Sequence, residues 1–251
     1  MKALRFIGRF VLDNWGLLLL LALWELWIAV ENLNSIVMPH SWSAVADIVT
    51  APNAYLANLG RTAMIAGLGL LIGVTVGTLI AVASWLSRLA NGFLSVAALI
   101  FSSVPVIAFI PILGRVMGYE TRTVLVIVAI ICFFPSFVFT VSGLRALPPG
   151  GADLLSVLGG SQFTVLRHMA LPSALPNWMT ALRLAAPTAI LAAMAAEFLM
   201  GTPGLGSMVH DSMNAFESAR AIGASILAAT LSLLCFGLAT RAETAVRARW
   251  T

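Results

Sequence analysis

The side chains that could do chemistry are few in this 251-residue chain, and their spacing predicts no catalytic site. Its only lysine is Lys2, so the chain lacks the lysine with which a phosphate-binding loop holds ATP. The histidines His40, His168 and His210 are far apart, and neither a His-Glu-x-x-His nor a Cys-x-x-Cys pattern occurs. We therefore predict a non-enzymatic chain with no catalytic residues, no metal and no cofactor of its own.

Two carboxylates fall inside apolar stretches of the sequence. Glu197 lies four residues before Gly201, at the end of one such stretch. A carboxylate in a membrane span is costly and usually faces a cavity or a partner, so a pathway role is one interpretation. The other is a carboxylate hydrogen-bonded near the following glycine-rich turn. Glu25 is flanked by Trp24 and Trp27, which predicts an isolated carboxylate in an interfacial aromatic belt.

The composition determines which elements must position these residues. The chain is 60% hydrophobic and 10% charged, with a mean hydropathy of +0.99. Soluble domains are about half apolar and about a quarter charged. These values exclude a soluble enzyme and a nucleic-acid-binding module. The net charge of +4 therefore needs a membrane explanation, and we expect lipid but no nucleic acid among the partners.

Runs free of charged residues locate the membrane spans. A helix needs about 20 apolar residues to cross the hydrocarbon core, and four long runs meet that requirement. Two further stretches each contain one carboxylate. We predict an all-α integral membrane protein, with a single domain over residues 1–251. Its six expected transmembrane helices cover about 15–30, 62–85, 90–113, 123–144, 180–200 and 221–240.

The distribution of basic residues predicts the orientation. With the N-terminus inside, ten basic residues fall on the inner side and four on the outer side. The inner set is Lys2, Arg5, Arg9, Arg88, Arg145, Arg167, Arg183, Arg241, Arg247 and Arg249, and the outer set is Arg61, Arg115, Arg122 and Arg220. The positive-inside rule then places both termini of this multi-pass protein in the cytoplasm.

The longest inner connection, residues 145–178, is too long for a simple turn. Its apolar residues recur at spacings of three and four, which predicts a helix that Gly159-Gly160 divides into two short ones. An apolar-faced helix outside the membrane must rest against something. Either it lies on its own bundle or the lipid headgroups, or it fits a groove on a soluble partner.

This connection carries the motif on which a family resemblance rests. Asp153-Leu154-Leu155, Gly159-Gly160-Ser161 and Leu171-Pro172 stand at the spacing of the cytoplasmic loop motif of binding-protein-dependent ABC importers. Ala196-Glu197 and Gly204-Leu205-Gly206 match the end of the family's fifth helix. From about Met38 onward, the sequence resembles the type I permease subunits of the sulfonate, taurine and nitrate branch.

The resemblance implies partners and roles for particular residues. Two permeases, as a homodimer or heterodimer, would form the translocation pathway, and a soluble binding protein would deliver the substrate. Two ATP-binding-cassette ATPase subunits would carry the ATP and Mg²⁺. The residues implied to contact the ATPase are Asp153, Leu154, Leu155, Gly159, Gly160, Ser161, Leu171 and Pro172. The candidate residues for the pathway or its gate are Glu197, Thr140, Gly204 and Gly206.

The substrate stays open at this point. The implied class is a small organic anion of the sulfonate, taurine or nitrate kind, or a related small molecule. One departure matters, because the family usually has two alanines where this chain has Leu154 and Leu155. A degenerate permease that only scaffolds its partner is therefore one alternative. An ion-gradient secondary transporter is another, although none of the four long spans holds the mid-span ionisable residue that it requires.

A stripe of small residues runs along the second expected helix. Gly69, Gly73 and Gly77 recur every four residues and so share one face. Small residues on one face let helices approach closely. We favour packing within one subunit over a contact between subunits.

Overall fold

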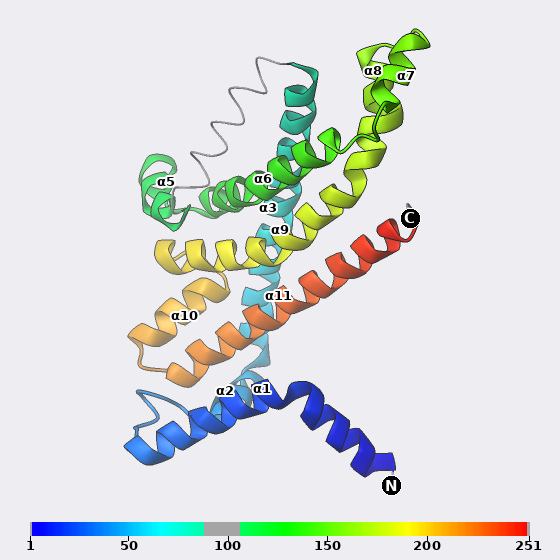
Figure 1. The fold of residues 1–251 in the computed structure, drawn as a ribbon. Helices are drawn as coiled ribbons and strands as arrows, with labels where there is room; N and C mark the ends of the chain where they lie inside the picture. The colour runs from blue at the N-terminus through cyan, green and yellow to red at the C-terminus, as the bar shows by residue number, and fades with distance from the viewer. Residues whose placement is uncertain (1, 88–105, 250–251) are drawn as a thin grey trace.

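The computed structural model describes residues 2–87 and 106–249, and within these ranges every regular element is a helix (Figure 1). In chain order these are α1 (Lys2–Glu31), α2 (Ser41–Thr50), α3 (Pro52–Leu86), η1 (Val106–Ala108), α5 (Phe109–Met117), α6 (Thr121–Arg145), α7 (Gly151–Val157), α8 (Gln162–Val165), η2 (Leu166–Ala170), α9 (Leu171–Met200), α10 (Leu205–Asn214) and α11 (Ser218–Arg247). The all-α fold class is thus confirmed.

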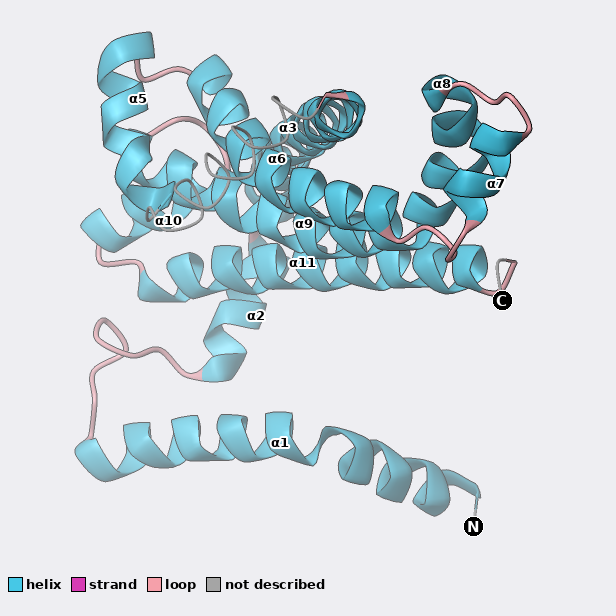
Figure 2. Ribbon diagram, turned by 45° about the horizontal axis from the view of Figure 1, so that its top comes forward, coloured by secondary structure: helices cyan, strands magenta, loops and turns pink. Residues whose placement is uncertain are grey.

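The two ends of the bundle differ in what they carry. Both chain termini lie on the same side as α7 and α8, and α5 and α10 lie on the opposite side (Figures 1 and 2). We call these the α7 side and the α10 side. The long helices α6, α9 and α11 run between the two sides, so each has one end at each side.

The core lies where α3, α6 and α9 pack together. Most of its large members come from α3 and α6, among them Ile65, Val124 and Ile127. α9 contributes mostly alanines, such as Ala189 and Ala193. Because alanine has the smallest side chain that still favours a helix, this face of α9 lies close to its neighbours.

Four described helical stretches are long and apolar enough to span a membrane. They are Pro52–Leu86, Thr121–Arg145, Gln162–Met200 and Ser218–Arg247. These stretches contain the expected spans 62–85, 123–144, 180–200 and 221–240. The expected span 15–30 lies within α1, which is not among the four. The expected span 90–113 falls mostly outside the described residues, and its last part forms η1 and the start of α5. The count of six therefore stays a prediction.

The helix expected over 180–200 begins earlier, at Leu171. The prolines at 172 and 176 suggested a break, but Pro172 lies in the first turn of α9, where a missing backbone N–H costs no helical bond. Just before it, the Leu171 N–H donates to the Leu166 carbonyl in a π-helical turn. The hydrogen bond of Leu171 thus spans five residues instead of four, and the next residue, Pro172, has no N–H and needs no acceptor. As a result, helical structure continues from Gln162 to Met200.

The connections between spans contain further short helices. The segment around Val45 and Ile48 forms α2. The connection over 201–220 contains α10. α11 also extends past the expected end at 240 to Arg247. This extension places charged residues beside α9.

Candidate functional site

Glu197 lies at the α10-side end of α9, and its side chain is fully buried. The Thr62 hydroxyl donates to Glu197 Oε2 at 2.8 Å, and the Gly206 N–H donates to the same oxygen at 3.0 Å. Thr62 Oγ1 in turn accepts from the Leu205 N–H at 2.8 Å. One carboxylate and one hydroxyl therefore join α9, α3 and the start of α10.

These bonds supply acceptors for the N–H groups at the start of α10. The first N–H groups of a helix have no partner within it, and they attract negative charge. The residue that precedes α10 is Gly204, which has no side-chain oxygen to accept from them. Thr62 and Glu197 supply the missing acceptors from two other helices. We call Thr62, Glu197, Gly204, Leu205 and Gly206 the Glu197 site.

The two glycines of the site are sterically required. A Cβ atom on Gly204 would lie 2.2 Å from the carboxyl carbon of Glu197. A Cβ atom on Gly206 would lie 2.1 Å from the Met194 carbonyl oxygen. Both distances are far below van der Waals contact, so any larger residue would push α10 away from α9.

The structure thus brings together three of the four residues predicted for the pathway or gate. The fourth, Thr140, lies near the α7-side end of α6, where its side chain is buried. The contacts of Glu197 match the interpretation of a carboxylate bonded at a glycine-rich turn. A pathway role for Glu197 and Thr140 stays a prediction.

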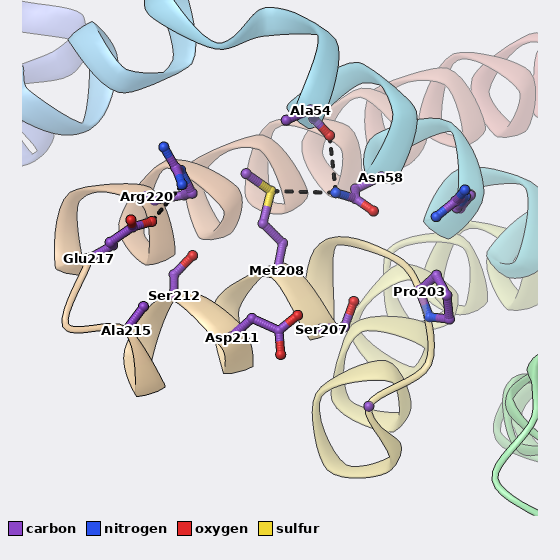
Figure 3. Close-up of a pocket in the computed structure, with 12 residues that line it drawn as sticks. Ala54, Asn58, Pro203, Ser207, Met208, Asp211, Ser212, Ala215, Glu217 and Arg220 are labelled. Atoms are coloured by element: carbon purple, nitrogen blue, oxygen red, sulfur yellow. Dashed lines mark hydrogen bonds and ion pairs between the residues drawn. The ribbon is translucent and has the colours of Figure 1, made fainter.

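An open hollow of about 480 Å³ adjoins the Glu197 site on the α10 side (Figure 3). It lies among α3, the 201–203 turn, α10 and the start of α11. Its lining is Ala54, Asn58, Arg61, Gly201, Pro203, Ser207, Met208, Asp211, Ser212, Ala215, Glu217 and Arg220. Charges of both signs and several amide and hydroxyl groups therefore line this hollow.

The start of α11 is attached to α2 and α3 beside this hollow. Arg220 Nε lies 3.3 Å from Asp47 Oδ2, and Arg220 Nη1 lies 2.5 Å from Glu217 Oε2. The Tyr55 hydroxyl donates to Asp47 at 2.5 Å and to the Arg220 carbonyl at 3.3 Å. These bonds hold the α10-side end of α11 in place.

Glu25 is not the isolated carboxylate that its aromatic flanks suggested. It accepts from the N–H and the hydroxyl of Ser41, at 2.8 and 2.7 Å, and it lies 2.7 Å from His40 Nδ1. The chain between α1 and α2 turns back and brings the start of α2 against Glu25. The sequence could not reveal this contact because its partners are 15 and 16 residues away.

The other candidate site is the 145–178 segment on the α7 side. α7 and α8 are separated at 158–161, as the Gly159-Gly160 pair predicted. Gly159 has φ +79°, a conformation that glycine adopts without strain, and a Cβ on Gly160 would lie 2.7 Å from the Leu155 carbonyl oxygen. Ser161 then caps α8, its hydroxyl accepting from the Thr164 N–H at 3.3 Å.

α7 presents an apolar face that nothing in the described chain covers. Leu154 is 62% exposed, Val157 84% and Leu158 73%. Leu155, the second departure from the family motif, is partly buried, and Asp153 is exposed. Leu171 and Pro172 lie in the first turn of α9, one short helix and a π turn further along. The two leucines are therefore not equivalent.

The glycine stripe of α3 packs against α6. A Cβ at Gly69 would lie 2.6 Å from Val128, one at Gly73 2.4 Å from the Ala129 carbonyl oxygen, and one at Gly77 2.7 Å from the Phe133 carbonyl oxygen. All of these neighbours belong to the same chain. The stripe therefore sets the distance between α3 and α6.

A second buried carboxylate, Glu243 on α11, was missed by the sequence analysis. Glu243 Oε2 lies 2.9 Å from Arg183 Nη1, and its Oε1 lies 2.9 Å from Arg247 Nη2. The Thr180 hydroxyl donates to Oε1 at 2.9 Å. The signal was the i,i+4 pair Glu243 and Arg247, which indicates that the helix continues beyond the apolar run.

The geometry now defines the class of the protein. Long apolar helices, packed through glycine and alanine and joined by buried polar bonds, are the features of an integral membrane protein. Residues 69–249 match the family described as "Binding-protein-dependent transport system inner membrane component". The chain belongs to this family, so it is the permease subunit of an ABC importer and not an enzyme. It is an integral protein of the inner membrane.

Individual relatives agree with this assignment. The chain is 23% identical to the formylaminopyrimidine transport permease protein of Halalkalibacterium halodurans, over 90% of each chain. It is 24% identical to the taurine transport system permease protein of Escherichia coli, over 78% of this chain and 74% of that one. A chain of an inward-facing structure of the MetNI methionine ABC transporter shares its fold, with a TM-score of 0.67 and 20% identity over 78% of this chain and 98% of that one.

Proposed function

We propose that this permease pairs with a second permease, as a homodimer or heterodimer, and that each of the two binds one ATP-binding-cassette ATPase. In this assembly the α7 side faces the cytoplasm and the α10 side faces the binding protein. Both chain ends lie on the α7 side, where ten of the fourteen basic residues are expected. ATP and Mg²⁺ are held by the ATPases, because the chain lacks a phosphate-binding lysine.

The observation that carries the proposal is the exposed apolar face of α7. Leu154, Val157 and Leu158 project from a short helix at the α7 side. Such a face is stabilised by burial in a groove on a partner. α8, η2 and α9 form one unbroken helical stretch, so a displacement of α7 that passes through the 158–161 loop to α8 reaches the membrane-spanning part of α9.

Leu154 and Leu155 have different roles: one contacts the ATPase, and the other stabilises the loop that follows α7. Leu154 is exposed and belongs to the proposed ATPase contact, together with Asp153. Leu155 is half-buried beside Gly160, and it supports the loop that Gly159, Gly160 and Ser161 form. We propose that this loop, with Leu171 and Pro172 at its junction with α9, is adapted to a groove wide enough for Leu154.

We propose a small organic anion, or a related small molecule, as the substrate class. Its support is the resemblance to the sulfonate, taurine and nitrate branch, together with the taurine permease among the relatives. In this reading Glu197, Gly204, Gly206 and Thr140 belong to the pathway or its gate. A binding protein, not this chain, then selects among the substrates.

The experiment is to co-express the chain with its neighbouring genes, purify it by a tag, and reconstitute the complex. An ATPase at equal stoichiometry and uptake that requires both ATP and the binding protein are expected. Uptake at full rate by the permease alone would overturn the proposal.

One alternative keeps a specific observation in its favour, namely the leucines that replace two alanines. If these leucines make the loop defective, so that this chain only scaffolds a partner permease, changing both Leu154 and Leu155 to Ala should improve the coupling of ATP hydrolysis to uptake. No change in coupling would argue against a defective loop. The ion-gradient alternative is excluded by the family assignment.

A further inference from the structure

The feature that the proposed function does not use is the ion cluster around Glu243. Glu243 is the last carboxylate of the chain, and its side chain is only 4% exposed. It contacts Arg183, Thr180 and Arg247, and Arg247 Nη2 also donates to Thr180 Oγ1 at 3.1 Å. Thr180 and Arg183 belong to α9, whereas Glu243 and Arg247 belong to α11. The cluster therefore closes across the contact between these two helices.

Stabilising the contact between α9 and α11 does not by itself explain this cluster. A buried carboxylate loses its hydration, and apolar residues of similar size usually hold two helices together at least as well. In some proteins a buried ion cluster instead selects one geometry of the parts that it joins. Thr180 and Arg183 are three residues apart on one face of α9, and Glu243 reaches both only in one rotational and axial position of α11. The cluster therefore fixes the alignment of the two helices.

The position of the cluster suits it to connect α9 with α11 close to the segment on which the ATPases act. Thr180 and Arg183 lie on the α7-side half of α9, beyond the junction with the 145–178 segment. At its other end, α11 is held to α2 and α3 through Arg220, Asp47 and Tyr55. α11 thus runs beside α9 from the α7 side to the hollow on the α10 side (Figure 1). The cluster therefore gives this part of α9 a polar connection to α11, through which a movement of α9 passes to α11 and on toward that hollow.

We propose that Glu243 is a positioning residue for energy coupling. By holding Thr180, Arg183 and Arg247 together, it makes α11 move with α9 as one body when the ATPases act on the 145–178 segment. The inference rests on the proposed function for its driving force, but the clamp between α9 and α11 can be measured without it.

The test uses the complete transporter, reconstituted with its ATPases and binding protein. The variants are Glu243→Gln, which removes the charge, and Thr180→Val, which removes one hydroxyl and keeps the side-chain shape. Glu243→Asp is the conservative variant. Arg241→Gln is the matched control, since Arg241 is an exposed charge on the same turn of α11.

Two quantities are measured. The first is the number of substrate molecules transported per ATP hydrolysed. The second is the distance between spin labels at the exposed positions Leu184 on α9 and Leu238 on α11, with and without ATP, after Cys132 and Cys235 are replaced by Ala. In the protein that keeps Glu243, we expect a narrow distribution of the distance between the two labels, and we expect ATP not to change it.

In Glu243→Gln, transport per ATP is expected to fall by at least about fivefold while ATP hydrolysis continues, and the distance is expected to broaden or to change with ATP. Thr180→Val should show a smaller change in the same direction, Glu243→Asp should recover most of the ratio, and Arg241→Gln should change neither quantity. A distance and a ratio that stay at the wild-type values in Glu243→Gln would overturn the proposal. If the Glu243→Gln transporter does not assemble, the two quantities are measured in Thr180→Val instead. Wild-type values of both quantities in Thr180→Val would then overturn the proposal.

The outcome is separable from that of the proposed function. If Leu154 and Leu155 prove irrelevant to uptake, the driving contact has been placed wrongly. The distance between α9 and α11 still reports whether Glu243 holds the two helices together.

Discussion

The carboxylate of Glu197 and the backbone N–H of Gly206 are nine residues apart in the sequence and 3.0 Å apart in the structure. Between them the chain leaves α9, turns at Gly201 and starts α10. Because the residue that precedes α10 is Gly204, which has no side-chain oxygen, the N–H groups of Leu205 and Gly206 depend on Thr62 and Glu197. The geometry of the α10 side is therefore set by a carboxylate of α9.

Removing this carboxylate should destabilise the α10 side. Glu197→Ala leaves the Thr62 hydroxyl and the Gly206 N–H buried without an acceptor, which costs about 1–3 kcal/mol. Glu197→Gln keeps one acceptor oxygen and should lose less. The measurement is the midpoint of heat-induced loss of the monodisperse complex in detergent. Glu120→Gln is the control, since Glu120 is exposed and pairs only with exposed Arg122. Equal midpoints for Glu197→Ala and this control would contradict the assigned bonds.

Gly206 should tolerate no side chain. In Gly206→Ala the added Cβ meets the Met194 carbonyl at 2.1 Å, so α10 must shift and the bonds to Glu197 and Thr62 lengthen. We expect a loss of about 1–3 kcal/mol, as for other overpacked sites, and reduced uptake. Gly237→Ala is the control, because nothing lies within 4 Å of its added Cβ. The same heat assay checks the stability, and a Gly206→Ala complex as stable as the control would show that the turn is not tightly packed.

The glycine stripe gives a prediction within a single helix. Gly73→Ala pushes α3 away from the backbone of α6, since its Cβ would lie 2.4 Å from the Ala129 carbonyl. Gly67→Ala, on an open face of α3, should have little effect or stabilise the helix slightly. Expression level and heat stability of the two variants are compared. The intrasubunit contact is refuted if Gly73→Ala behaves like Gly67→Ala.

The two leucines of α7 should give different phenotypes. Leu154→Ala removes an exposed apolar side chain, so it should weaken binding of the ATPase and leave the heat stability of the permease unchanged. Leu155→Ala removes a half-buried side chain, so it should mainly lower the stability of the α7–α8 loop. ATPase retention during purification and susceptibility of the loop to limited proteolysis measure the two effects. The same defect in both variants would refute the division of roles.

Much of the fold could be predicted because the hydrocarbon core imposes simple rules. A span must be long, apolar and helical, and these requirements are visible in runs between arginines such as Arg61 and Arg88. The start of α9 was placed too late, at about 180, whereas the helix begins at Leu171. Pro172 lies in the first turn of α9, after a π turn that no periodicity rule predicts.

The polar contacts could not be predicted, because they join residues that are distant in the sequence. Glu197 could be singled out for its cost in a membrane, but nothing in the sequence pointed to Thr62, 135 residues away. Glu243 was overlooked because it lies beyond the apolar run, among basic residues that indicate an exposed helix end. Only the packing of α11 on α9 buries it. The sequence can therefore show that a carboxylate stands in an apolar stretch, but only the tertiary structure shows which groups bind that carboxylate.

The unbroken helical stretch from Gln162 to Met200 has a consequence for how this chain can vary in length. Over its 39 residues, each position is fixed in angle relative to every other one. Deleting a single residue between Pro172 and Glu197 would rotate Glu197 by about 100° and shift it by about 1.5 Å relative to α7. The carboxylate would then point away from α10. Insertions and deletions should therefore be excluded from this stretch even where substitutions are tolerated, and they should accumulate in the connection over 146–150, which precedes α7.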